Sequence, residues 1–246
     1  MQIIPAFVTQ NKCYQAGAPL TPRGIMLHSV GTPQPSARAL VRYMDQYQPG
    51  GQSVCVHAFA QADGTVYQTL PWEMRGWHCG GSANSTHIGV EMTEPSAGMT
   101  RSEAAEQIAG TYRTVVELFA ELCKQYELDP AQDGVIIGHA EGHRRGVASN
   151  HADPELLWRT YDMGYTMDGF RRDVAEAMKN GAREEALDMP RYDSVAEMPQ
   201  WARAGVQRLI DRGVLSGVGN GKLDLSLDMI RTMIVCQRMV DEQKET

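Results

Sequence analysis

The sequence predicts an α/β fold: a central mixed β-sheet flanked by helices, with a small helical unit at the C-terminus. Short runs of apolar residues recur along the chain, as buried strands require. A turn signal at Asp63-Gly64 joins two of these runs as a hairpin. A long segment with apolar residues at three- and four-residue spacing is typical of a helix with one buried face. The predicted strands cover 25–27, 54–60, 65–70, 87–92 and 135–137.

Two helices of the main domain begin at recognisable capping residues. Ser36 is the predicted N-cap of a helix of about ten residues, closed by the proline and glycines at 49–51. Thr100 and Glu103 form a capping box at the start of the long amphipathic segment. We expect this second helix to be a scaffold for the sheet.

A change in composition divides the chain. A helix predicted over 168–178 ends at Asn180-Gly181, and the charged, proline-terminated stretch that follows is typical of a linker. We therefore assign residues 1–180 to the main domain, 181–192 to a linker and 193–246 to a small helical unit.

The small unit has two predicted amphipathic helices, over 201–212 and 227–240, with Ser226 as the N-cap of the second. Because roughly fifty residues are few for an independent core, we expect the unit to dock on the main domain, to pair with a copy of itself or to rest on a polymer.

Composition excludes several classes of function. The net charge of −7 provides no global basic field for binding nucleic acid. Five cysteines without a C-x-x-C pair favour neither a disulfide framework nor a cysteine zinc knuckle. The N-terminus has no pattern of a signal peptide, and no apolar run reaches the ~20 residues of a membrane span. We expect synthesis in the cytoplasm and no membrane insertion.

Three side chains form a candidate metal site. His28 and His139 each follow an apolar strand, so two neighbouring strands would aim both imidazoles at one point. With Asp153 and one open position, they make a ligand set for catalytic zinc. Taken singly, however, a histidine at a strand end is more often a hydrogen-bonded core or rim residue.

His139 and His143 are an alternative ligand pair, because residues four apart share a helix face. Gly142 and the lack of a helical pattern argue against this alternative.

The other candidate residues each have two interpretations. Glu91, in an apolar strand, is either an ion-pair partner for an arginine such as Arg75 or a general base whose pKa is raised by burial. Trp72 and Trp77 are ordinarily packing residues, but the glycine-rich loop beside them, with Asn84, suits a substrate groove.

Five stretches in this order resemble the zinc-dependent N-acetylmuramoyl-L-alanine amidases of type 2, the T7-lysozyme and peptidoglycan-recognition-protein family. They are Gly24 to Ser29, Val56 to Gln68, Trp77 to Gly80, His87 to Glu91, and Gly138-His139 with Asp153-Pro154. The resemblance covers about residues 12–160. The sequence of residues 148–154 is similar to that of phage and prophage endolysins.

The resemblance implies one zinc ion on His28, His139 and Asp153, with Glu91 as the catalytic glutamate. The family usually has a lysine where this chain has His151, which would then stabilise the oxyanion. Some members have a catalytic tyrosine where this chain has Val56, so that contribution is absent. The implied partner is peptidoglycan, reached by holin-type release during lysis.

Residues 193–246 resemble a single S-layer-homology-like motif. This resemblance implies binding to a wall polymer or self-association. Two rival functions stay open for the main domain: a recognition module that binds muropeptide without cutting it, and a zinc peptidase that cuts elsewhere in the stem peptide.

Overall fold

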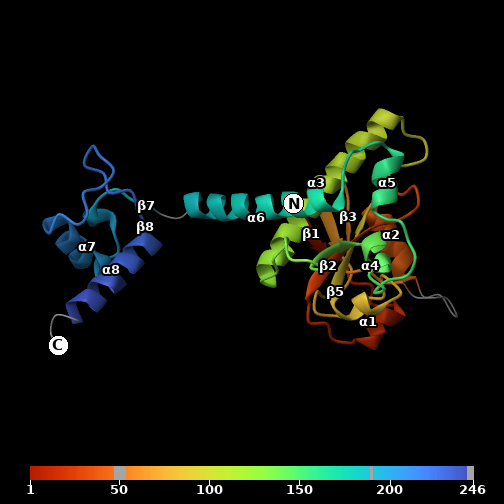
Figure 1. The fold of residues 1–246 in the computed structure, drawn as a ribbon, viewed down its shortest axis with the longest axis horizontal. Helices are drawn as coiled ribbons and strands as arrows, with labels where there is room; N and C mark the ends of the chain where they lie inside the picture. The colour runs from red at the N-terminus through yellow and green to blue at the C-terminus, as the bar shows by residue number, and fades with distance from the viewer. Residues whose placement is uncertain (47–53, 189–190, 243–246) are drawn as a thin grey trace. The chain divides into compact units, whose positions relative to one another are not determined.

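The computed structural model describes residues 1–46, 54–188 and 191–242. The predicted helix closure at 49–51 lies outside these residues. The chain forms two compact units, Met1–Asn180 and Gly181–Thr246, which are described separately (Figure 1). Among the described residues, no helix is both long enough and apolar enough to cross a bilayer.

The first unit is built on a six-stranded mixed sheet, in the order β1-β4-β3-β5-β2-β6. Only the β3–β4 pair is antiparallel, and Gly64 at φ +85° lies in the turn between these strands, as the hairpin signal predicts. The strands are β1 (Gln2–Pro5), β2 (Gly24–Ser29), β3 (Ala58–Ala60), β4 (Thr65–Gln68), β5 (His87–Met92) and β6 (Ile136–Gly138). The predicted mixed α/β class is therefore confirmed.

Helices cover the sheet on both faces. The long helix α3 contacts β3 and β5, whereas α2 contacts β3 and β4, and α4 contacts β2 and β6. Ser36 caps α2, and Thr100 with Glu103 forms the predicted capping box of α3. The helices of this unit are α1 (Lys12–Ala16), α2 (Ala37–Asp45), the short 3-10 helix η1 (Ser82–Ser85), α3 (Arg101–Gln125), α4 (His139–Arg144), α5 (Glu155–Thr160) and the part of α6 (Met167–Asp188) up to Asn180.

Alternation along the strands decides which side chains meet α3. In β2, Ile25 and Leu27 belong to the main core cluster with α3, while Met26 belongs to a separate cluster on the other face. Because side chains alternate with a period of two, His28 lies on the face of Met26, away from α3. Glu91 is the register partner of His28 in β5, so both side chains lie on the same face.

Two predictions about helices are wrong. The segment from His139 to Arg144 is helical, although its sequence shows no helical pattern. So short a helix is stabilised by its capping and tertiary contacts rather than by a periodic apolar face. The helix predicted to end at Asn180-Gly181 continues to Asp188, so most of the predicted linker is helical. An interior glycine costs about 1 kcal/mol, and the Ala, Arg, Glu and Leu residues that follow favour helix.

The second unit has a small buried cluster of its own, at Met198, Ala202, Val206, Leu225, Ile230 and Ile234. Ser226 accepts a hydrogen bond from the backbone of Met229 at 3.3 Å, as its predicted capping role requires. The elements of this unit are β7 (Arg191–Tyr192), the short 3-10 helix η2 (Val195–Glu197), α7 (Gln200–Asp211), β8 (Leu225–Ser226) and α8 (Leu227–Glu242).

Candidate metal and catalytic site

The structure brings His28, His139 and Asp153 together at one edge of the sheet. β2 and β6 are hydrogen-bonded parallel neighbours, so His28 near the end of β2 lies beside His139, which follows β6 directly. The two Nδ1 atoms are 3.0 Å apart, and Asp153 oxygens lie 3.3 Å from Nδ1 of His28 and 3.6 Å from Nδ1 of His139. This is the arrangement that the two strand ends predict.

A chain of buried hydrogen bonds decides which nitrogen of His28 faces this point. His78 Nε2 lies 3.1 Å from the carbonyl of His87, which can only accept, so His78 carries its proton on Nε2. Burial lowers the pKa of His78 well below its ordinary value, so the ring is neutral and its Nδ1 accepts from His28 Nε2 at 3.0 Å. His28 is therefore left with Nδ1 for a metal ion.

A parallel arrangement orients His139. The hydroxyl of Ser149 donates to the carbonyl of Cys79 at 3.0 Å, so its oxygen accepts from His139 Nε2 at 3.2 Å. The Nδ1 atom of His139 thus also faces the shared point, and burial lowers the pKa of His139 to about 4. A neutral imidazole is the form that binds a metal.

Charge at this point favours a cation. Burial alone would lower the pKa of His28, but the hydrogen bond to Asp153 and the charges of Glu91 and Asp153 raise it. Burial would raise the pKa of Asp153, but His28 holds it below its ordinary value. The site therefore stabilises positive charge between the rings and the carboxylate, which is what a metal ion supplies.

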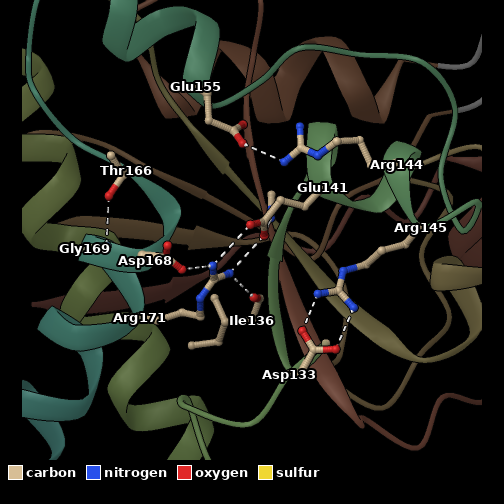
Figure 2. A network of polar contacts seen from close by, with 12 residues as sticks. Asp133, Ile136, Glu141, Arg144, Arg145, Glu155, Thr166, Asp168, Gly169 and Arg171 are labelled. Carbon is tan, nitrogen blue, oxygen red and sulfur yellow. Dashed lines mark hydrogen bonds and ion pairs between the residues drawn. The ribbon is translucent and has the colours of Figure 1, made fainter.

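The junction between β6 and α4 is fixed by an arginine from α6 (Figure 2). Arg171 donates to the carbonyl of Ile136 and to Glu141, each at 2.9 Å, and Glu141 in turn accepts from the backbone of Gly138 at 3.3 Å. These bonds hold the residues on both sides of the point where His139 leaves the strand. An ion pair that is largely shielded from water fixes geometry more firmly than an exposed one.

Close packing at Gly138 sets the position of Asp153, the third candidate ligand. A Cβ atom at Gly138 would lie 2.9 Å from Pro154 Cδ, so only glycine lets the segment that carries Asp153 approach this closely. Ala140 also donates its backbone N–H to the Asp153 carbonyl at 3.1 Å. The first residues of α4 and the segment before α5 are thereby tied together.

Glu91 is a half-buried carboxylate beside the three ligands. Its Oε2 atom is buried without a hydrogen-bond partner among the described residues, and burial raises its pKa to about 7. In the described part of the chain no ion pair joins Glu91 to Arg75 or to another arginine, so the ion-pair interpretation does not hold there. A carboxyl group with a pKa near neutrality can both accept and release a proton.

These groups share one open cavity of about 680 Å³. His151 is exposed, lines this cavity and stacks on the ring of His139, with the ring centroids 4.6 Å apart. The cavity lining also includes Ser29, Glu94, Leu156 and Tyr161. Ser29 Oγ donates a hydrogen bond to Oε1 of Glu94 at 2.7 Å.

The three predicted substrate-binding residues lie outside the lining of this cavity. Trp72 stacks on the buried His57 ring, with centroids 6.5 Å apart, and Trp77 packs in a small cluster beside Leu70. Asn84 accepts from the backbone N–H groups of the residues at 78 and 79, at 2.9 and 3.0 Å. Their direct contact with substrate stays a prediction, and these contacts favour a supporting role.

The alternative ligand pair of His139 and His143 is not formed. Both residues lie in α4, but His143 is exposed and lines a different cavity. The metal-ligand geometry among the described residues joins His139 to His28 and Asp153 instead.

Sequence reasoning missed His78 and Ser149, the residues that orient the two histidines. Gly89, in the middle of the apolar strand β5, is the signal that could have found His78. A Cβ atom there would lie 2.4 Å from Cγ of His78, so the strand must carry glycine to admit the ring. Ser149 gives no comparable signal, because it is one serine in a polar segment.

Replacing His78 tests the hydrogen-bond chain without measuring turnover. His78→Ala should weaken zinc binding about 10- to 100-fold, since His28 loses the acceptor that orients it. His78→Asn, which keeps a side-chain acceptor, should lose less. Competition between the metal-free protein and a chromogenic chelator measures the affinity. His143→Ala is the control, and a folded His78→Ala protein with the parent affinity would contradict the chain.

Glu91 should make the metal-free protein less stable as pH rises. Below about pH 4.5 its carboxyl is protonated in both the folded and unfolded states, so no difference arises. Between about 4.5 and 7 only the folded state holds the proton, so stability falls with pH. Glu91→Gln should therefore be more stable than the parent at pH 8, by up to about 3 kcal/mol, but not at pH 4.

Urea unfolding in the presence of a chelator measures this difference. The exposed Glu121→Gln variant is the control, and its effect should be small at both pH values. A stabilisation by Glu91→Gln that is equal at both pH values would rule out a raised pKa as the cause.

Comparisons with known proteins identify a family that matches this chain and solved structures that share its fold. Residues 18–156 match a family model described as N-acetylmuramoyl-L-alanine amidase. No curated protein sequence gives a significant match. Among solved structures, the Staphylococcus aureus hydrolase AmiA in complex with its ligand has a TM-score of 0.60 at 21% identity, over 75% of this chain and 86% of that chain.

Two other solved structures share the fold. A mutant endolysin from Bacillus subtilis has a TM-score of 0.50 at 20% identity, over 71% of this chain and 99% of that one. The PlyG catalytic domain has a TM-score of 0.52 at 19% identity, over 72% and 96%. Since the family model covers more than half of the 246 residues, the chain belongs to the N-acetylmuramoyl-L-alanine amidase family.

Proposed function

We propose that this chain is a zinc-dependent amidase that hydrolyses the bond between N-acetylmuramic acid and L-alanine in peptidoglycan. One observation carries the proposal: the three ligand atoms and the unpartnered oxygen of Glu91 share a single cavity. The family supports the amidase activity, and the site supports the metal and the general base.

The residues fit zinc in chemistry and in spacing. Two imidazole nitrogens and a carboxylate are a known ligand set for catalytic zinc. Tetrahedral bonds of 2.0–2.1 Å place ligand atoms about 3.3 Å apart. The two Nδ1 atoms are 3.0 Å apart, Asp153 Oδ2 lies 3.3 Å from that of His28, and Asp153 Oδ1 lies 3.6 Å from that of His139. One ligand atom from each residue thus lies within 4.8 Å of the others. When bound by His28, His139 and Asp153, zinc supplies Lewis acidity that activates a water molecule and the scissile carbonyl.

Glu91 is assigned the proton transfers. Its free oxygen accepts a proton from the attacking water and then delivers it to the leaving nitrogen of L-alanine. A pKa near 7 suits both steps, because the carboxylate and the acid are then of similar free energy at neutral pH. Burial of Glu91 is thus part of its function.

His151 is assigned to the oxyanion that forms on the scissile carbonyl. It lines the same cavity, and its ring is held against His139 by stacking. From this position an N–H group of His151 can donate to the oxyanion as charge develops. It takes the place of the lysine that the family usually has.

We further propose that the protein acts as an endolysin of phage or prophage origin, which reaches the wall after holin-type release. The resemblance of residues 148–154 to endolysins supports this proposal. Residues 193–246 would bind a wall polymer or self-associate, and the exposed Trp201, Val214 and Val218 offer apolar surface for such a contact.

Glu91→Gln separates the amidase from its rivals. The variant should keep bound zinc and lose at least 10³-fold in rate, since the amide cannot act as a base. Incubation of the parent with purified cell walls should release peptides with N-terminal L-alanine, identified by end-group analysis. A different N-terminal residue would indicate a peptidase, and binding to walls without new amino groups would indicate a recognition module.

Two substitutions test His151. His151→Lys should keep appreciable activity because the ammonium group can also stabilise the oxyanion, whereas His151→Ala should lose roughly 10²-fold in kcat. Zinc content, measured for each variant, should be unchanged. Parent-like activity in both variants would show that another group holds the oxyanion.

A further inference from the structure

A second cavity adjoins the catalytic cavity. His151 and Ala152 line both, so the two share a wall. The second cavity, which we call the basic cavity, is lined by Ala140, His143, Arg144, Asn150, His151, Ala152, Glu155 and Arg159. A substrate that extends past His151 would enter it next.

Two helix faces meet across the basic cavity. Ala140, His143 and Arg144 lie three and four residues apart in α4, so they share one face, while His139 reaches the metal site. Glu155 and Arg159, four apart in α5, share another. The cavity is therefore built from regular elements that the Arg171 network and the packing at Gly138 hold in place.

The charge of the basic cavity differs from that of the whole chain. The chain carries a net charge of −7, yet this lining contains two guanidinium groups and one carboxylate. The exposed Arg144 lies 3.7 Å from the half-buried Glu155, a long contact that neutralises its charge little (Figure 2). Arg159 is exposed and has no acidic partner in the part of the chain that the structure describes.

We propose that the basic cavity is a subsite for a carboxylate of the stem peptide, held chiefly by Arg159 with help from Arg144. The proposal rests on the amidase function proposed above. The residue that follows L-alanine in peptidoglycan carries either a free carboxylate or its amide. A planar guanidinium group binds a carboxylate through two parallel hydrogen bonds, which an amide cannot accept.

Two matched substrates test this subsite. They are muramyl peptides that differ only in a carboxylate or a primary amide on the residue after L-alanine. Arg159→Ala should raise KM for the carboxylate substrate roughly tenfold, the loss expected for a hydrogen bond to a charged group. Its KM for the amide substrate and both kcat values should stay at the parent level.

Two further variants make the comparison specific. Arg159→Lys keeps the positive charge at the end of α5 but loses the paired hydrogen bonds, so its KM should lie between those of the parent and of Arg159→Ala. Arg113→Ala, at an exposed position of α3, should leave the discrimination unchanged. Equal changes for both substrates in a folded Arg159→Ala protein would overturn the subsite.

Direct binding keeps this test separate from that of the amidase. Calorimetric titration of the Glu91→Gln protein with each peptide should show tighter binding of the carboxylate form. The double variant Glu91→Gln/Arg159→Ala should bind both peptides with equal affinity. If the parent cleaves neither substrate, the amidase proposal fails while the binding preference still decides the subsite. Equal affinities for the two peptides would reject the subsite whether or not the parent is active.

Discussion

The parallel pairing of β2 with β5 on one side and β6 on the other is the constraint on which the site depends. Register makes Glu91 the neighbour of His28, and the end of β6 places His139 beside it. Strand alternation directs His28 and Glu91 away from α3, while Leu27 and Val90 fill the apolar core. A register slip of one residue would exchange the two sets and lose both site and core.

The face that carries the site is a buried polar layer, and its stability depends on complete hydrogen bonding. His28, His78 and His139 are nearly inaccessible to solvent, and each has a defined partner. A buried polar group without a hydrogen-bond partner lowers the free energy of unfolding by about 1–3 kcal/mol. Such a layer is therefore stable only when each chain of hydrogen bonds ends in a strong acceptor. The carbonyl groups of His87 and Cys79 are those acceptors. Glu91 Oε2 is one of the buried atoms of the described residues that lack such a partner, and Glu91 is the residue assigned to proton transfer.

The fold was largely predictable because its strands and helix caps are local signals. Gly64, Ser36 and the Thr100 capping box lie where the sequence places them. The convergence of His28 and His139 was predictable too, since strand ends collect at one edge of a sheet. The hydrogen bonds that orient these rings were not, because Ser149 and His78 reach the site from loops whose course no period determines.

The errors have physical causes as well. The segment 139–144 is too short to show helical periodicity, and it is held by Arg171 from outside. In α6, Asn180-Gly181 predicts a helix end, but the residues after Gly181 favour continuation of the helix. Glycine and asparagine are weak predictors of a helix end where a distant side chain or the neighbouring sequence determines whether the helix forms or continues.

Arg171 supports the candidate site from α6, a helix that lies beyond the end of the family match. The family match stops at residue 156, yet the guanidinium group that bonds the carbonyl of Ile136 and the carboxylate of Glu141 belongs to α6. Phe170 and Val174, from the same helix, fill the main core. A fragment cut at the homology boundary would keep all three proposed metal ligands and lose the arginine that holds the segment before His139 in place. The structural unit around the candidate site is therefore longer than the matched sequence, because the first turns of α6 pack into its core.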